Sequence, residues 1–144
     1  MKAVLVPVGK MPEVVELDDG NLRSMQDAVG GRIELCSWVF GDEPAVYVNE
    51  EGKFACEPNR AVYATEADAG RVRWDGTVVE EGDLLDILFG DFVCVGYDPE
   101  TGEDRDVTED EVSRVMARFG TRWSVESGWA EALRIKVQAR AESH

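Results

Sequence analysis

Histidine is almost missing from this chain, because the only one among its 144 residues is His144, the last residue. Chain ends are often poorly ordered, which makes His144 a poor candidate for a fixed catalytic group. Histidine is the usual general base near neutral pH and the usual partner of a nucleophilic serine or cysteine. We therefore exclude Ser-His-Asp and Cys-His catalysis and most zinc hydrolase sites, and we expect a protein that is not an enzyme.

Cysteine is also scarce, with three residues, Cys36, Cys56 and Cys94, separated by 20 and 38 positions. A zinc site made of cysteines alone needs closely spaced pairs, and a disulfide framework needs an even number. No phosphate loop or dinucleotide fingerprint is present either. We expect reduced, buried thiols, no metal and no cofactor, as in a cytoplasmic protein.

Long apolar runs are missing as well. No stretch approaches the roughly 18 apolar residues of a membrane-spanning helix. The N-terminus offers about six apolar residues before Gly9 and Lys10, fewer than the core of a signal peptide. We therefore expect no membrane association.

Basic residues are few, since 15 of them stand against 30 acidic ones and give a net charge of -15. Such a field repels nucleic acid and anionic membranes, so we expect no direct binding to DNA or RNA. The same charge suits a basic surface on a partner protein. Mimicry of DNA is an alternative, although it needs carboxylates in one array and here basic residues interrupt them.

What the chain does contain predicts an α+β fold with a mixed, mostly antiparallel sheet and two to three short amphipathic helices. Hydrophobic residues make up 44%, enough for one core in a chain of this length. Turn residues separate short runs rich in valine, and the run at 92–97 has the length and apolar character of a central strand. We expect strands at 2–8, 12–17, 32–40, 45–49, 53–56 and 92–97. We also expect a hairpin of strands at 72–74 and 77–80 around a two-residue turn at Asp75 and Gly76, a helix capped by Asn21 and ended by Gly30, and a helical turn at 84–89 after Asp83.

The best-specified helix begins at a capping box made by Thr108 and Glu111 and ends at Gly120. The tail is less clear. Residues 133–140 alternate strictly between apolar and polar side chains, which favours a strand, yet the alanine and glutamate around them also suit a helix. We predict a single domain over 1–120 and a C-terminal extension over 121–144, a strand that packs on the domain or extends it.

The candidate binding residues are Asn59 and Arg60, with Asn49 and Tyr63 beside them. An amide and a guanidinium follow each other in a short loop that enters a strand, and a guanidinium can hold a carboxylate or phosphate with two hydrogen bonds. The partner would be a small anionic ligand or another protein. In the alternative interpretation Asn59 caps a turn and Arg60 pairs with a nearby acid.

The four tryptophans are far apart. Trp38 and Trp74 lie in expected strands, where packing in the core is the usual role. Trp123 and Trp129 flank the tail. If the tail docks weakly, these two form an exposed patch for self-association or for a partner.

A resemblance to a known family covers about residues 1 to 120. It is carried by four segments taken together, Val29–Glu34, Asn49–Lys53, Pro58–Arg60 and Gly90–Gly96. The chain resembles a family of small bacterial and phage domains of unknown function, common on plasmids, phages and other mobile elements. The resemblance implies no activity and no catalytic residue. It implies a setting in which small acidic proteins act as accessory or counter-defence factors.

Three functions follow from these observations. The first is a non-enzymatic binding or protein-interaction module. The second is an acidic mimic of DNA that blocks a DNA-binding protein. The third is a small enzyme that acts on a nucleotide or phosphorylated metabolite through Asn59, Arg60 and a carboxylate such as Asp68 or Asp86.

Overall fold

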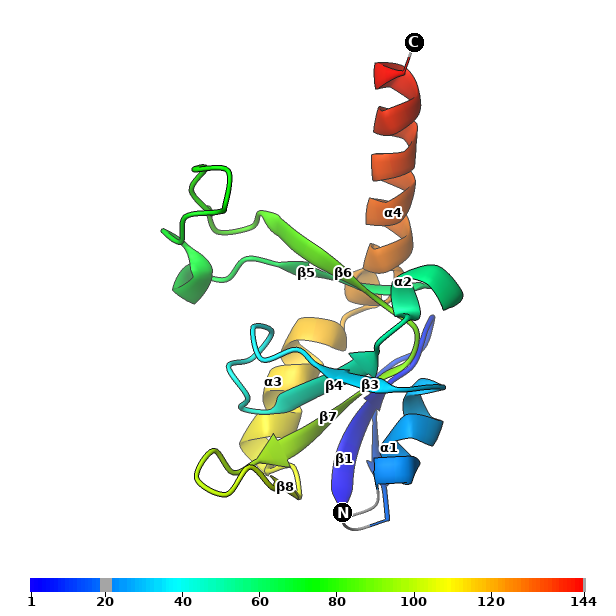
Figure 1. The fold of residues 1–144 in the computed structure, drawn as a ribbon, viewed down its shortest axis with the longest axis vertical. Coiled ribbons are helices and arrows are strands. Elements are labelled where there is room, and N and C mark those ends of the chain that lie inside the picture. Colours follow the sequence, from blue (N-terminus) through cyan, green and yellow to red (C-terminus); the bar gives the residue numbers. More distant parts are fainter. Residues whose placement is uncertain (19–21, 144) are drawn as a thin grey trace.

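A computed structural model describes residues 1–18 and 22–143, so the predicted cap Asn21 and His144 lie outside the described residues. The predicted α+β class is confirmed (Figure 1). Within the described residues an antiparallel sheet has the strand order β2-β1-β7-β4-β3, with β8 beside β7, and β5 and β6 form a separate ribbon. The elements are β1 (Lys2–Val6), β2 (Glu13–Glu16), α1 (Leu22–Val29), β3 (Ile33–Leu35), β4 (Ala45–Asn49), α2 (Gly52–Ala55), β5 (Pro58–Tyr63), a 3-10 turn (Glu66–Asp68), β6 (Leu84–Phe89), β7 (Phe92–Tyr97), β8 (Asp104–Arg105), α3 (Glu109–Phe119) and α4 (Arg122–Glu142).

Strand β7 is the centre of the sheet, as its continuous apolar run predicted. It lies between β1 and β4 and is antiparallel to both. Successive side chains of a strand point to opposite faces, so Phe92 and Cys94 enter the core on one side and Val93 and Val95 the core on the other. Helix α3 contributes Val115 to the first core, and α1 contributes residues to the second. The sheet is therefore covered by helices on both faces.

Helix α3 starts at the predicted capping box. The Thr108 hydroxyl accepts from the Glu111 amide at 3.1 Å, and the Glu111 carboxylate accepts from the Thr108 amide at 3.0 Å. The same carboxylate accepts from Arg105 at 2.8 Å. Arg105 reaches it by crossing β7 at Gly96, where any Cβ would overlap the guanidinium. The cap thus fixes α3 to the edge formed by β8.

The ribbon β5-β6 projects from the sheet, and the first turns of α4 pack against β5 before the helix runs away from the ribbon (Figure 1). Two small residues permit the close approach. A Cβ on Gly128 would lie 2.6 Å from the carbonyl carbon of Asn59, and the Ser127 hydroxyl accepts from the Ala61 amide at 2.9 Å. From Leu133 onward the described residues of α4 are exposed, and this end of the helix extends away from the body.

The prediction of a strand in the C-terminal tail is wrong, because residues 122–142 form helix α4. The alternating pattern of residues 133–140 meets no sheet, since all of them are exposed. Without burial to select the period, the high helix propensity of alanine, arginine, lysine and glutamine decides. Glu131 and Arg134, one helical turn apart, form an ion pair of 2.9 Å that further stabilises the helix.

Three short segments also differ from the predictions. Residues 84–89 form strand β6 instead of a helical turn, residues 52–55 form helix α2 instead of a strand, and the predicted strand 32–40 ends at Leu35. A short apolar run does not distinguish helix from strand, so tertiary contacts decide. The turn at Asp75 and Gly76 is present, but it contains three residues, closed by a bond from the Arg73 amide to the Thr77 carbonyl.

No described helix combines the length and the apolar character that crossing a bilayer requires.

Gly128→Ala should destabilise the protein, although alanine is the better helix former. The added methyl would overlap the main chain of Asn59 and Arg60, and overpacking of this kind costs about 1–3 kcal/mol. The control Ala130→Ser adds one atom at an exposed position of the same helix and should change the free energy of unfolding by less than about 0.5 kcal/mol. Urea unfolding followed by circular dichroism measures both. A Gly128→Ala protein as stable as the wild type would contradict this close packing.

Glu111→Gln should weaken the dependence of stability on acid. Burial raises the pKa of the Glu111 carboxyl, but the bonds from Arg105 and Thr108 outweigh it and hold that pKa below 4.5. A carboxyl with a depressed folded pKa contributes stability above its unfolded pKa and loses it as the pH falls through the folded value. The unfolding free energies of the two proteins should therefore differ most at pH 7, by about 1–3 kcal/mol, and the difference should shrink as the pH falls below 4.5. Glu109→Gln, at an exposed position, is the control; a gap that does not depend on pH would refute the assignment.

Candidate functional site

The Arg60 guanidinium is completely buried, with 0% of the residue exposed. It donates to main-chain carbonyls of three segments: Nε to Phe119 at 3.2 Å, Nη1 to Pro7 at 3.3 Å and Nη2 to Lys10 at 2.6 Å. Burial lowers the pKa of Arg60 to about 10. Because Phe119 ends α3, the charge also sits at the negative end of a helix dipole.

Asn59 completes this cluster. Its amide nitrogen donates to the carbonyls of Val6 and Gly90, each at 2.8 Å, and its oxygen accepts from Arg60 Nη1 at 2.6 Å. The two side chains therefore join β5 to the end of β1, to the turn between β6 and β7 and to the end of α3. All of these bonds hold the fold together, and the guanidinium presents no surface to an anionic ligand.

Asn49 and Tyr63 serve other contacts. Asn49 donates to the Val29 carbonyl at 3.2 Å and accepts from the Glu51 amide at 2.8 Å, which connects the end of α1 to the start of α2. The Tyr63 ring packs against Trp123 with centroids 5.2 Å apart. Burial, together with the Glu131 carboxylate, raises the pKa of Tyr63 to about 12. Of the four candidate binding residues, only Asn49 lines the groove described next.

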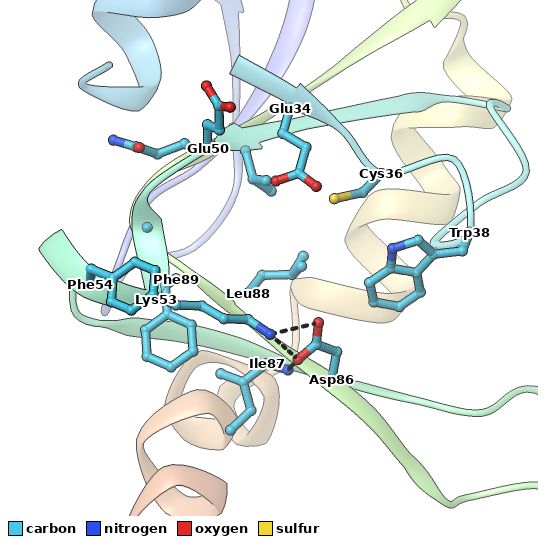
Figure 2. Close-up of a pocket in the computed structure, with 13 residues that line it drawn as sticks. Glu34, Cys36, Trp38, Glu50, Lys53, Phe54, Asp86, Ile87, Leu88 and Phe89 are labelled. Atoms are coloured by element: carbon cyan, nitrogen blue, oxygen red, sulfur yellow. Dashed lines mark hydrogen bonds and ion pairs between the residues drawn. The ribbon is translucent and has the colours of Figure 1, made fainter. Parts of the chain in front are cut away.

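The ribbon forms a groove with the loop 36–44 and helix α2. Two cavities, of about 300 and about 450 Å³, share Trp38 and Asp86 and follow β6 from Phe89 to Leu85. Figure 2 shows the first cavity, with Glu34, Cys36 and Trp38 on one side and Lys53, Asp86 and Ile87 on the other. We call this feature the arm groove; its residues are Glu34, Cys36, Trp38, Val48, Asn49, Glu50, Gly52, Lys53, Phe54, Arg71, Val72, Arg73, Trp74, Val79, Leu85, Asp86, Ile87, Leu88 and Phe89.

Two arginines of α3 hold the loop that carries Trp38. Arg118 donates to the carbonyl of Val39, and Arg114 donates to the carbonyl of Glu43 at 2.7 Å. Arg118 also lies over the Phe40 ring, 5.5 Å from its centroid, and donates to the carbonyl of Tyr63 at 2.8 Å. The same side chain therefore links the loop that carries Trp38 to the end of β5.

The edge of β6 forms the floor of the arm groove. The Ala61 amide donates to Ser127 of α4 and therefore points away from β6. Ala61 and Ile87 are thus a non-hydrogen-bonded pair of the antiparallel ladder, in which neither residue bonds to the other. The Ile87 amide consequently points away from β5. It donates to the carboxylate of its own neighbour, Asp86, at 2.8 Å. Lys53 approaches the two oxygens of that carboxylate at 3.1 and 3.3 Å (Figure 2).

Aromatic side chains around the arm groove are exposed. Phe54 is 94% and Trp74 is 99% exposed, and Trp38 is 36% exposed at the junction of the two cavities. The prediction that Trp38 and Trp74 pack in the core is wrong, because the strands expected around them do not form. The turn residues beside Trp74 were the one available signal, since turns lie at the surface.

The charge of the arm groove differs between its ends. At the α2 end the carboxylates of Glu34 and Asp86 point into the cavity, where Lys53 is the one lining cation (Figure 2). At the other end Arg73 pairs with Asp83 at 3.0 Å and Arg71 with Asp68 at 3.4 Å. The α2 end therefore has excess negative charge and suits a basic side chain.

The Cys36 thiol also lines the arm groove. Burial and the Glu34 carboxylate raise its pKa to about 11, so it is protonated at neutral pH and is not an activated nucleophile. Among the described residues, no group of three or more histidine, cysteine, aspartate or glutamate side chains is placed to hold a metal ion.

The two tryptophans of α4 are both exposed. They are six positions apart, which places them about 120° apart around a helix. Trp123 packs on Tyr63, whereas Trp129 shares a helix face with Leu133 at the spacing of four residues. Trp129 and Leu133 are 55% and 59% exposed, so they form an apolar patch on the surface of α4.

Comparison with known proteins agrees with the resemblance seen in the sequence. Residues 1–120 match the model of a family described as "Domain of unknown function (DUF3846)". The chain belongs to this family. No curated protein and no solved structure matches the chain. The DUF3846 region contains Asn59, Arg60 and the whole arm groove, while α4 begins just after it.

Arg60→Met should destabilise the fold strongly, by roughly 3 kcal/mol, because it takes the Arg60 donors from the buried carbonyl of Phe119 and the part-buried carbonyl of Lys10. Arg140→Met, at an exposed position of α4, is the matched control and should change stability by less than about 0.5 kcal/mol. Urea unfolding of the two variants gives the comparison. Equal stabilities would show that Arg60 does not tie the segments together.

Proposed function

We propose that this protein is a non-enzymatic interaction module that binds a segment of another protein in the arm groove. The observation that carries the proposal is the combination of exposed aromatic side chains, Trp38, Phe54 and Trp74, around a strand edge that has no strand partner on its groove side among the described residues.

Exposed aromatic side chains support a protein ligand. Tryptophan and other aromatic residues contribute most to protein interfaces, since they bury large areas at a small entropic cost. Leaving them in water is unfavourable, and contiguous exposed apolar surface usually marks an interaction site. Here Phe54 stands at one end of the arm groove and Trp74 at the other, with Trp38 between them. Apolar groups thus occur along its whole length.

Charge supports a basic ligand. The net charge of -15 attracts cationic partners over long distances and repels acidic ones. Inside the arm groove, the Glu34 carboxylate provides a local negative charge at the α2 end (Figure 2). A basic segment of a partner protein is favoured by both fields.

The resemblance to domains of mobile elements fits this proposal. An accessory factor of such an element would act by binding a protein of the element or of its host. The arm groove lies within the region that the family shares. The residues that line the arm groove therefore all belong to the DUF3846 domain, and none of them lies on α4.

A selection from a random peptide library, displayed against the immobilised full chain, tests the function. We expect enriched peptides whose binding falls at least about tenfold in the double variant Trp38→Ala/Phe54→Ala, because two anchoring rings are lost. Trp129→Ala, which removes an exposed ring on α4, should leave binding unchanged. Fluorescence anisotropy of labelled peptides measures the affinities. A library that yields no binder, or binders that tolerate the double variant, would overturn the proposal.

A further inference from the structure

We propose that the ligand adds to the open edge of β6 as an extended strand, and that the Asp86 carboxylate caps this edge until the ligand displaces it. The inference rests on the proposed function and names the mode of binding and the chemistry of the ligand.

The two edges of the ribbon differ in what covers them. Helix α4 covers the outer edge of β5, where Ser127 satisfies the Ala61 amide and Gly128 lies against the main chain. The outer edge of β6 faces the arm groove, and its Ile87 amide bonds to a side chain instead of a strand. An unpaired edge is a template for another strand, which natural proteins usually block with a charge or a covering element. Asp86 is such a charge.

The Asp86 carboxylate is placed so that a ligand can replace it on the Ile87 amide. One Asp86 oxygen accepts from both Ile87 and Lys53, and the side chains of Asp86 and Lys53 are 38% and 61% exposed. An exposed ion pair adds little stability, so the carboxylate can rotate away at small cost. A carbonyl of an incoming strand would then accept from the Ile87 amide in its place. The released carboxylate stays beside Lys53.

The shape of the arm groove limits the length of strand that can bind. Helix α2 closes one end, because Gly52 lies so near the Phe89 carbonyl that a Cβ would be 2.8 Å from that oxygen. The stretch of β6 left open runs past Leu85 and Ile87, and both cavities lie along it. A bound strand would lie about 4.8 Å from β6. The site therefore takes a short extended segment.

Side chains along the arm groove define the ligand. Alternate side chains of a strand point to opposite faces, so one set of ligand side chains would face Glu34 and Trp38. Glu34 selects a basic side chain, and Trp38 with Val79 selects apolar ones. The ligand we infer is an extended peptide in which a lysine or arginine is flanked by apolar residues.

Removal of the Asp86 carboxylate tests the proposal, because a cap and a ligand contact predict opposite changes in affinity. Loss of a cap should tighten peptide binding, whereas loss of a contact should weaken it. Asp86→Ala frees the Ile87 amide, so peptides selected from the library should bind about 2- to 10-fold more tightly, the factor expected from removing one competing hydrogen bond. Glu81→Ala is the matched control, since it removes the same charge from an exposed turn outside the arm groove and should leave affinity unchanged. In the Asp86→Ala protein the same peptides should slow hydrogen exchange of the Ile87 amide at least about tenfold.

The outcomes separate the two proposals. Peptides that need Trp38 and Phe54 but bind Asp86→Ala no more tightly, and leave the Ile87 amide unprotected, would overturn strand addition while the interaction function stands. Failure to select any peptide overturns the interaction function itself. Protection of Ile87 without peptide, together with dimers of Asp86→Ala in analytical ultracentrifugation, would show that a second copy occupies the edge, contrary to the ligand inferred here.

Discussion

The buried guanidinium of Arg60 is the constraint on which the rest of the structure depends. A charge removed from water needs its donors satisfied, and here carbonyl oxygens of Pro7, Lys10 and Phe119 satisfy them. These carbonyls belong to segments that no strand ladder links to β5. Asn59 adds bonds to Val6 and Gly90. Together they determine how the ribbon leaves the sheet, and the angle of the ribbon creates the arm groove.

Further contacts make the arm groove a preformed feature. Arg118 holds the loop 36–44 and the end of β5 at once, and α4 fixes the far side of β5 through Ser127 and Gly128. Helix α3 therefore holds the loop wall of the arm groove in place, and α4 holds the ribbon in place. A preformed groove loses little conformational entropy when it binds, which favours affinity for a short segment.

Sequence patterns predicted the elements whose determinants are local. The capping box of α3 and the apolar run of β7 lie within one segment each, and both predictions are confirmed. Strand β6 and helix α4 were mispredicted because their periods suit either structure and the neighbours that decide lie elsewhere in the chain. The candidate site was harder still. Apart from its neighbour Asn59, Arg60 bonds to residues 50 to 59 positions away, so neither its burial nor these partners can be predicted from the adjacent sequence.

Several of the many acidic residues have a structural role, because their carboxylates accept hydrogen bonds from main-chain amides. Asp91 accepts from the Val8 amide at 2.8 Å and Asp106 from the Lys2 amide at 2.9 Å, so carboxylates replace missing main-chain acceptors at several places. Asp86 does the same for Ile87 at an open strand edge. A carboxylate there opposes pairing between copies of an acidic protein, because each copy would bring the same charge to the other. Only a ligand that brings positive charge and a free carbonyl compensates for displacing it, so one residue both protects the edge and selects what may bind there.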